Sequence, residues 1–118
     1  KFKGSVFEYT DAAKNFLMYL KRYPETIPTV MLAWDNEARK PGRGTIFANC
    51  TPEKYKDWVI KMCIHTKEYK KTEDTLIFIN AWNEWSEGTY LEPDRRFGYA
   101  YLKSTAEALA EFENLKKT

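Results

Sequence analysis

The sequence is poor in the residues that build metal sites and disulfide frameworks. It has two cysteines, Cys50 and Cys63, and a single histidine, His65. The cysteines form no C-x-x-C pair, so the ligand spacing of the common zinc sites is absent. We therefore predict two structural thiols, no metal and no cofactor. His65 falls late in a predicted helix, and we expect it to be structural.

Long apolar runs and blocks of one charge are also missing. No run approaches the roughly 18 to 20 apolar residues of a membrane span, and no signal-peptide pattern opens the chain. The 19 basic and 17 acidic residues are spread along the sequence and leave a net charge of +2. No polybasic or acidic tract indicates a nucleic acid or a membrane surface. We predict neither partner, and the compartment stays unknown.

The sequence does contain enough apolar residues for one folded unit. Of its 118 residues, 43% are hydrophobic, and the length lies in the range of roughly 50 to 250 residues that is usual for a domain. The chain begins at Lys1 without an initiator methionine and runs directly into structured-looking sequence. We therefore expect a fragment of a longer polypeptide, with the missing part upstream.

Apolar spacing predicts three helices and two strands. Helical periodicity marks residues 11–23, 51–66 and 97–115, and the first two segments have capping residues at their starts. Short continuous apolar runs at 29–34 and 76–82 favour strands buried on both faces. The strand–helix–strand order predicts a parallel βαβ unit with a right-handed crossover, and hence the α/β class.

The connections are less informative. Residues 35–50 read as a long loop, since strand-to-helix connections usually have about 2 to 6 residues, and a polar link precedes Leu76. Residues 5–9 give a weak strand signal. Two or three βα units are only part of an eight-stranded barrel, which takes about 250 residues. They leave strand edges uncovered, so we expect the isolated chain to self-associate.

Polar and aromatic residues gather where the two predicted strands end. The first strand is followed by Trp34, Asp35, Asn36 and Arg39, and the second by Trp82, Asn83, Glu84, Trp85 and Glu87. Ligands of parallel α/β proteins bind at the carboxyl ends of the strands. We therefore expect both groups to lie on one rim of the sheet.

Carboxyl groups dominate these two strand ends. Glycosidic chemistry uses two of them, roughly 5 to 10 Å apart, and the candidates are Asp35, Glu84, Glu87 and Glu92. A tryptophan beside an acid can desolvate the carboxyl group, raise its pKa and offer a flat face to a sugar ring. Trp82 and Trp85 fit that description.

Each of these residues also has a structural interpretation. Glu84 and Glu87 could cap a turn or pair with Arg95 and Arg96, and the three tryptophans at the strand ends could be core residues. Asp35 could simply close a turn.

Two further segments also have both a functional and a structural interpretation. Arg39, Lys40 and Arg43 could hold a diphosphate or form a solvated basic loop, of which the loop is favoured. Thr51 completes a glycosylation sequon at Asn49 but is better explained as a helix cap.

One long run carries a resemblance to a known family. Residues 79–94, INAWNEWSEGTYLEPD, resemble the hallmark near the end of the WbsX-type glycosyltransferases, whose barrel is akin to that of the endo-α-mannosidase glycoside hydrolases. Further likenesses are Trp34-Asp35-Asn36 with Arg39, and Gly98-Tyr99 with Tyr101-Leu102. The sequence departs from the pattern at Glu37, Ala38 and Ser86.

The resemblance implies roles and a fold. In the related mannosidases both glutamates of the N-E-W-x-E-G motif are catalytic, and they match Glu84 and Glu87. Glu87 is implied as general acid/base, and Glu84 as the group that assists attack at the anomeric carbon. Residues 1–118 are implied to be the C-terminal two or three βα units of a single (β/α)8 catalytic domain. The substrate-binding candidates are Trp34, Asp35, Asn36, Arg39, Trp82, Asn83, Trp85 and Glu92.

The activity implied is glycan processing in bacterial lipopolysaccharide or other surface-polysaccharide assembly. Its substrate is an oligosaccharide or a nucleotide sugar, and transfer would place the enzyme in the cytoplasm. Hydrolysis stays open, because a carboxylate pair serves both reactions and no Asp-x-Asp metal signature of common transferases is present.

Two further hypotheses follow from the residues. The first is a non-catalytic carbohydrate-binding module that uses Trp34, Trp82 and Trp85. The second is an isolated fragment that is inactive, because catalytic groups need placement within about 0.5 Å.

Overall fold

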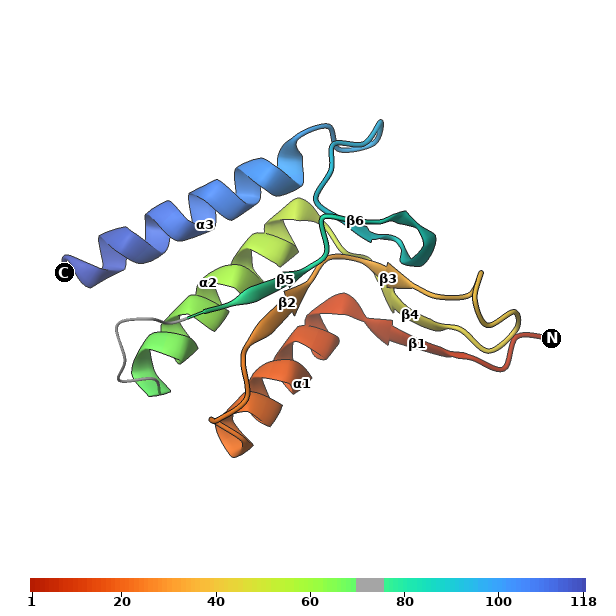
Figure 1. The fold of residues 1–118 in the computed structure, drawn as a ribbon, viewed down its shortest axis with the longest axis horizontal. Helices are drawn as coiled ribbons and strands as arrows, with labels where there is room; N and C mark the ends of the chain where they lie inside the picture. The colour runs from red at the N-terminus through yellow and green to blue at the C-terminus, as the bar shows by residue number, and fades with distance from the viewer. Residues whose placement is uncertain (70–75) are drawn as a thin grey trace.

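The computed structural model describes residues 1–69 and 76–118 as a mixed α/β structure of three helices and small sheets (Figure 1). The elements in chain order are β1 (Ser5–Glu8), α1 (Tyr9–Arg22), β2 (Thr29–Met31), β3 (Trp34–Asp35), β4 (Thr45–Ala48), α2 (Pro52–Tyr69), β5 (Phe78–Asn80), β6 (Asn83–Glu84), the 3-10 turn η1 (Trp85–Glu87), β7 (Thr89–Tyr90) and α3 (Ala100–Lys116). The predicted α/β class is confirmed. The described strands do not close into a barrel. Part of the predicted polar link lies outside the described residues.

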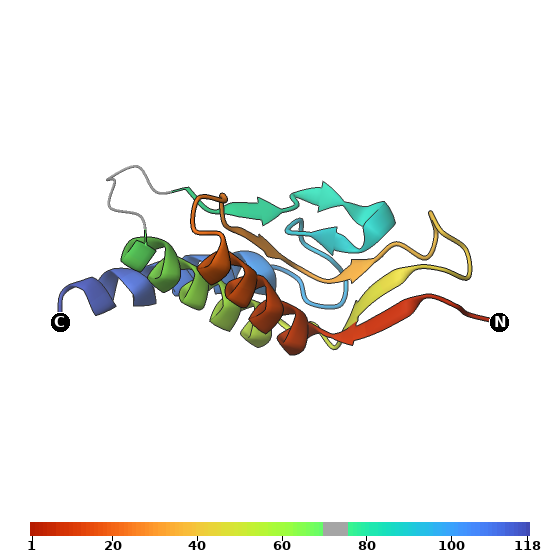
Figure 2. The ribbon, with the colours of Figure 1, turned by 90° about the horizontal axis from the view of Figure 1, so that it is seen from below.

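The predicted βαβ unit forms the centre of the molecule. β2 and β5 pair in parallel, with Val30 opposite Ile79, and α2 connects them. All three helices lie along one side of this strand pair (Figure 2). Val30 is buried on the helix side, whereas the side chain of Phe78 is 55% exposed. The helix layer therefore covers one face of the pair and leaves the other open.

A second sheet extends beyond the ends of β2 and β5 and corrects the prediction of a long loop. Residues 35–50 contain β4, which folds back antiparallel on β3 and runs parallel to β1. The weak strand signal at residues 5–9 is confirmed as β1, but β1 pairs with β4 and not with β2. The three strands β1, β4 and β3 thus build a rim past the carboxyl end of β2.

Helix α2 begins as its capping residues predict. Thr51 accepts a hydrogen bond from the backbone N–H of Lys54 at 3.2 Å, and Pro52 occupies the first helical position, where its missing N–H has no cost. The structural interpretation of Thr51 is confirmed. The bounds of α1 and α3 lie within three residues of the predicted ones. No helix among the described residues is long and apolar enough to cross a membrane.

The core lies between the helices and the β2–β5 pair. Trp58, Tyr55 and Met62 of α2 are almost completely buried, and the ring of Tyr9 meets Trp58 edge-on at 5.5 Å. The Tyr9 hydroxyl donates to the backbone oxygen of Met31 at 2.6 Å and so ties α1 to the end of β2. Both cysteines are free thiols, and His65 is buried against Tyr69, as expected of structural residues.

The bond between Tyr9 and Met31 gives a stability prediction. Tyr9→Phe removes the hydroxyl donor from the partly buried carbonyl oxygen of Met31 and should lower the free energy of unfolding by about 1 to 2 kcal/mol. Tyr19→Phe, on the same helix but 54% exposed, is the matched control and should change it by less than about 0.5 kcal/mol. Urea unfolding followed by circular dichroism measures both. Equal effects would contradict the assigned role of Tyr9.

Candidate active site

The parallel pairing of β2 and β5 brings the two polar strand ends to one rim, as predicted. After β2 the chain enters the β3–β4 turn, and after β5 it enters a hairpin made of β6, η1 and β7. The tip of this hairpin lies close to β3, since a methyl group on Gly88 would be 3.8 Å from the backbone nitrogen of Asp35. The two loops are therefore in contact range.

The hairpin geometry follows from its sequence. Glu84 pairs with Thr89 across the two short strands, and Trp85, Ser86 and Glu87 form the 3-10 turn between them. Gly88 ends that turn with a φ of 65°, a left-handed conformation that favours glycine. The turn sends the side chains of Glu84 and Glu87 toward a common partner.

That partner is Arg39 of the β3–β4 turn. Its Nη2 lies 3.3 Å from an oxygen of Glu84, and its Nε lies 3.1 Å from an oxygen of Glu87. The Glu87 side chain is 19% exposed and that of Glu84 is 38% exposed, so the pair is only partly open to solvent. One guanidinium thus holds both carboxylates, one from β6 and one from the 3-10 turn η1.

Ser86 completes this cluster. Its hydroxyl accepts a hydrogen bond from Arg39 Nη2 at 2.9 Å and donates to Glu84. The hydrogen bond from Ser86, and then the charge of Arg39, hold the pKa of Glu84 below its usual range despite some opposing desolvation. Glu84 is therefore an anion at neutral pH. The idea that tryptophans raise the pKa of the neighbouring acid is wrong for Glu84.

The β3–β4 turn is braced from within, and the bracing positions Arg39. The carboxylate of Glu37 accepts the backbone N–H groups of Gly42 and Gly44, the second at 2.8 Å. Asn36 is buried, and its side-chain oxygen accepts the N–H of Thr45 at 2.6 Å. The backbone N–H of Arg39 donates to the Asn36 carbonyl at 3.0 Å. The side-chain oxygen of Asn36 is thus engaged inside the turn.

An aromatic pair flanks the carboxylates. The rings of Trp85 and Tyr90 stack 3.7 Å apart, at an interplanar angle of 17°. The indole N–H of Trp85 donates to Glu92 at 2.5 Å, and the Tyr90 hydroxyl donates to Asp94 at 2.8 Å. Burial and the hydrogen bond to Asp94 raise the pKa of Tyr90 to about 12, so its hydroxyl stays neutral. Two carboxylates thus fix the orientation of both rings.

The structure decides between several interpretations of the sequence. Trp82 and Trp85 are 53% and 47% exposed, so they are not core residues. Asp35 does close a turn, because its carboxylate accepts the N–H of Glu37 at 2.9 Å. Trp34 is half-buried in β3 opposite Phe47.

The salt-bridge partner of the glutamates also differs from the structural interpretation. Among the described residues Glu84 and Glu87 pair with Arg39 and not with Arg95 or Arg96. Arg39 is therefore part of the carboxylate cluster, although its side chain is 56% exposed and Lys40 and Arg43 are exposed, as expected of a solvated basic loop.

Two members of the site were missed by the sequence argument. Ser86 bonds both Arg39 and Glu84, and Tyr90 stacks on Trp85. The signal for Ser86 was its place two residues after Glu84, inside a turn. The described residues contain no cluster of three or more histidine, cysteine or carboxylate side chains that could hold a metal ion. Asn83, in β6, is exposed.

Comparison with known proteins agrees with the resemblance in the sequence. The model of the family described as "Glycosyltransferase WbsX" matches residues 1–105. An uncharacterized protein WxcX of Xanthomonas campestris pv. campestris strain B100 is 40% identical over 108 residues, which is 92% of this chain and 16% of that protein. The WxcX protein of strain ATCC 33913 is 39% identical over the same lengths.

The chain therefore spans about one sixth of the curated relatives it matches. No solved structure matches it. Because the family match covers nearly the whole chain, including β2, β5 and both loops of the rim, this chain belongs to the WbsX glycosyltransferase family.

Proposed function

We propose that the full-length protein is a glycan-processing enzyme, a glycosyltransferase, in which Glu84 and Glu87 act at the anomeric carbon of a sugar. The observation that carries this proposal is the Arg39 guanidinium, which holds both carboxylates at the end of β5. Two carboxyl groups that share one guanidinium are close enough to flank a single bond, and glycosidic chemistry places them roughly 5 to 10 Å apart. Family membership supports a sugar substrate.

The two carboxylates have different environments, and this difference supports different roles. Glu84 is kept anionic by Ser86 and Arg39, which suits a group that faces developing positive charge at an anomeric carbon. Glu87 is the more buried of the two and is the proposed general acid/base. Arg39 orients both, and the exposed rings of Trp82 and Trp85 offer flat faces to sugar rings.

We also propose that residues 1–118 are the C-terminal part of one (β/α)8 catalytic domain. The parallel β2–β5 pair has helices on one face only, and Phe78 and Leu76 are 55% and 63% exposed. In a barrel the uncovered face would point to the packed interior. The isolated 118 residues are accordingly expected to be inactive, and to self-associate through these strands.

Loss of the Glu87 carboxylate should slow turnover strongly. We expect Glu87→Gln in the full-length protein to lower turnover by about 10²- to 10⁴-fold, because an amide cannot exchange the proton. Mass spectrometry of products from a panel of nucleotide sugars and oligosaccharides measures this, and the substrate consumed separates transfer from hydrolysis. Glu53→Gln, an exposed acid in the first turn of α2, is the control. Unchanged turnover in Glu87→Gln would refute the assignment.

The lowered pKa of Glu84 gives a pH prediction. A carboxylate with a lowered pKa stays ionised as the pH falls, so the acidic limb of kcat/KM should lie below the usual titration range of a glutamate. Ser86→Ala removes the largest cause of the shift and should move that limb to higher pH. A pH–rate profile of both proteins checks the sign. A limb that stays in place, or moves to lower pH, would show that Ser86 does not act on Glu84.

The exposed tryptophans favour a second candidate function, a non-catalytic carbohydrate-binding module. In such a module Trp85→Ala should remove oligosaccharide binding, while Glu87→Gln should leave the affinity within a few fold. Isothermal titration with the same oligosaccharide panel distinguishes the two functions. Binding that depends on Trp85, combined with no turnover on any substrate, would select the module over the enzyme.

A further inference from the structure

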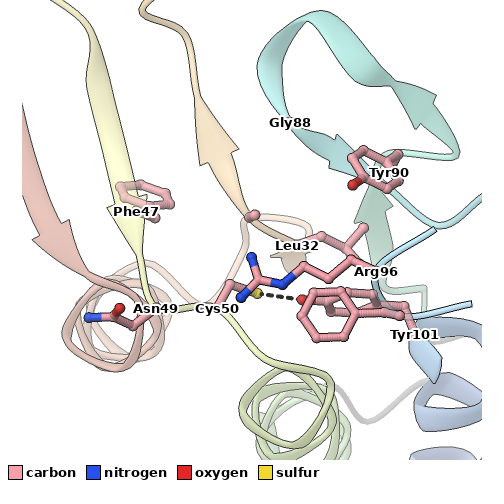
Figure 3. A pocket seen from close by; sticks show the side chains of 10 residues that line it. Leu32, Phe47, Asn49, Cys50, Gly88, Tyr90, Arg96 and Tyr101 are labelled. Carbon is pink, nitrogen blue, oxygen red and sulfur yellow. Dashed lines mark hydrogen bonds between the residues drawn. The ribbon is translucent and has the colours of Figure 1, made fainter. Parts of the chain in front are cut away.

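A pocket lies on the same rim, and none of Arg39, Glu84 and Glu87 lines it. It has a volume of about 260 Å³ and lies between the hairpin, the end of β2, and the starts of α2 and α3 (Figure 3). We call it the rim pocket. The described residues that line it are Leu32, Ala33, Phe47, Asn49, Cys50, Gly88, Tyr90, Arg96, Phe97 and Tyr101.

Arg96 is the only charged side chain among these lining residues. Figure 3 shows its guanidinium directed into the space between Tyr101 and the Asn49–Cys50 segment. No ion pair of Arg96 with a carboxylate is present among the described residues. A guanidinium that has no carboxylate partner keeps its fork of N–H donors free for a ligand anion.

The surroundings explain why Arg96 stays unpaired. The nearest acid along the chain, Asp94, is occupied, because its carboxylate accepts the Tyr90 hydroxyl and the backbone N–H of Phe97. The guanidinium carbon of Arg96 lies 4.8 Å from the centre of the Phe97 ring, which supports one face of the group. Burial raises the pKa of the Cys50 thiol, so this neighbour is uncharged and offers Arg96 no anionic partner.

The other walls suit one sugar ring. Tyr90, Phe97, Phe47 and Tyr101 give the pocket aromatic surface, and Asn49 adds an amide that can bond a hydroxyl group. The volume is slightly below the roughly 300 to 1,000 Å³ of drug-sized sites, so it matches a single ring rather than an oligosaccharide.

We propose that the rim pocket binds one sugar ring that carries an anionic substituent, with Arg96 as the residue that recognises the anion. The proposal deepens the proposed function, because it takes the ring to be part of the glycan processed at Glu84 and Glu87. Tyr90 connects the two sites, since one face of its ring stacks on Trp85 and the residue also lines the rim pocket. The substrate class is then an acidic glycan.

A binding experiment tests this independently of turnover. Isothermal titration of the full-length protein uses glucuronate, glucose and glucose 6-phosphate as probes. We expect the anionic sugars to bind at least about tenfold more tightly than glucose, and Arg96→Gln to remove that preference, because charge-assisted bidentate bonds are lost. Tighter binding of glucuronate assigns a carboxylate, and tighter binding of glucose 6-phosphate assigns a phosphate.

Arg95→Gln is the matched control, because Arg95 carries the same charge on the same loop but does not line the rim pocket. Arg96→Lys keeps the charge and loses the fork, and should retain part of the preference. The proposal is overturned by equal binding of glucose and the anionic sugars, by no binding of any probe, or by an equal loss in Arg95→Gln. The same titration is repeated on Glu87→Gln. Anionic preference that persists in this variant supports the rim pocket whether or not Glu87 is catalytic, so the two proposals can fail separately.

Discussion

The parallel pairing of β2 with β5 is the constraint on which the rest of the structure depends. These strands are only three residues long, but their register sets where the chain leaves the sheet on both sides of α2. The end of β2 leads into the turn that carries Arg39, and the end of β5 leads into the hairpin that carries Glu84 and Glu87. The guanidinium of Arg39 therefore reaches Glu84, which is 45 positions away in the sequence.

Local sequence predicted the positions of the catalytic candidates well. Each strand lies within a short apolar run that is followed by polar residues, and the rule that ligands bind at strand ends needs no further knowledge of the fold. The start of α2 was equally predictable, because Thr51 and Pro52 act through bonds and dihedral angles of their own residues.

The partner of the carboxylates was not predictable in the same way. Arg95 and Arg96 are close to Glu87 in sequence, whereas Arg39 reaches it only because β4 folds back on β3. That folding depends on Glu37 and Asn36, whose side chains bond the backbone across the turn, and apolar periodicity does not record such bonds. Strand β4 was missed for a related reason, since it is short and lies directly behind Gly42 and Gly44.

The proposed site depends on Arg39, Glu84 and Glu87 acting as one unit, and a double-mutant cycle on turnover tests this most directly. Turnover of the full-length protein is compared for Arg39→Gln, Glu87→Gln and the double variant. If the guanidinium acts by holding the carboxylates, the double variant should be no slower than the slower single variant, because groups that act together are not additive. Losses that multiply would contradict it and would mean that Arg39 acts separately from Glu87.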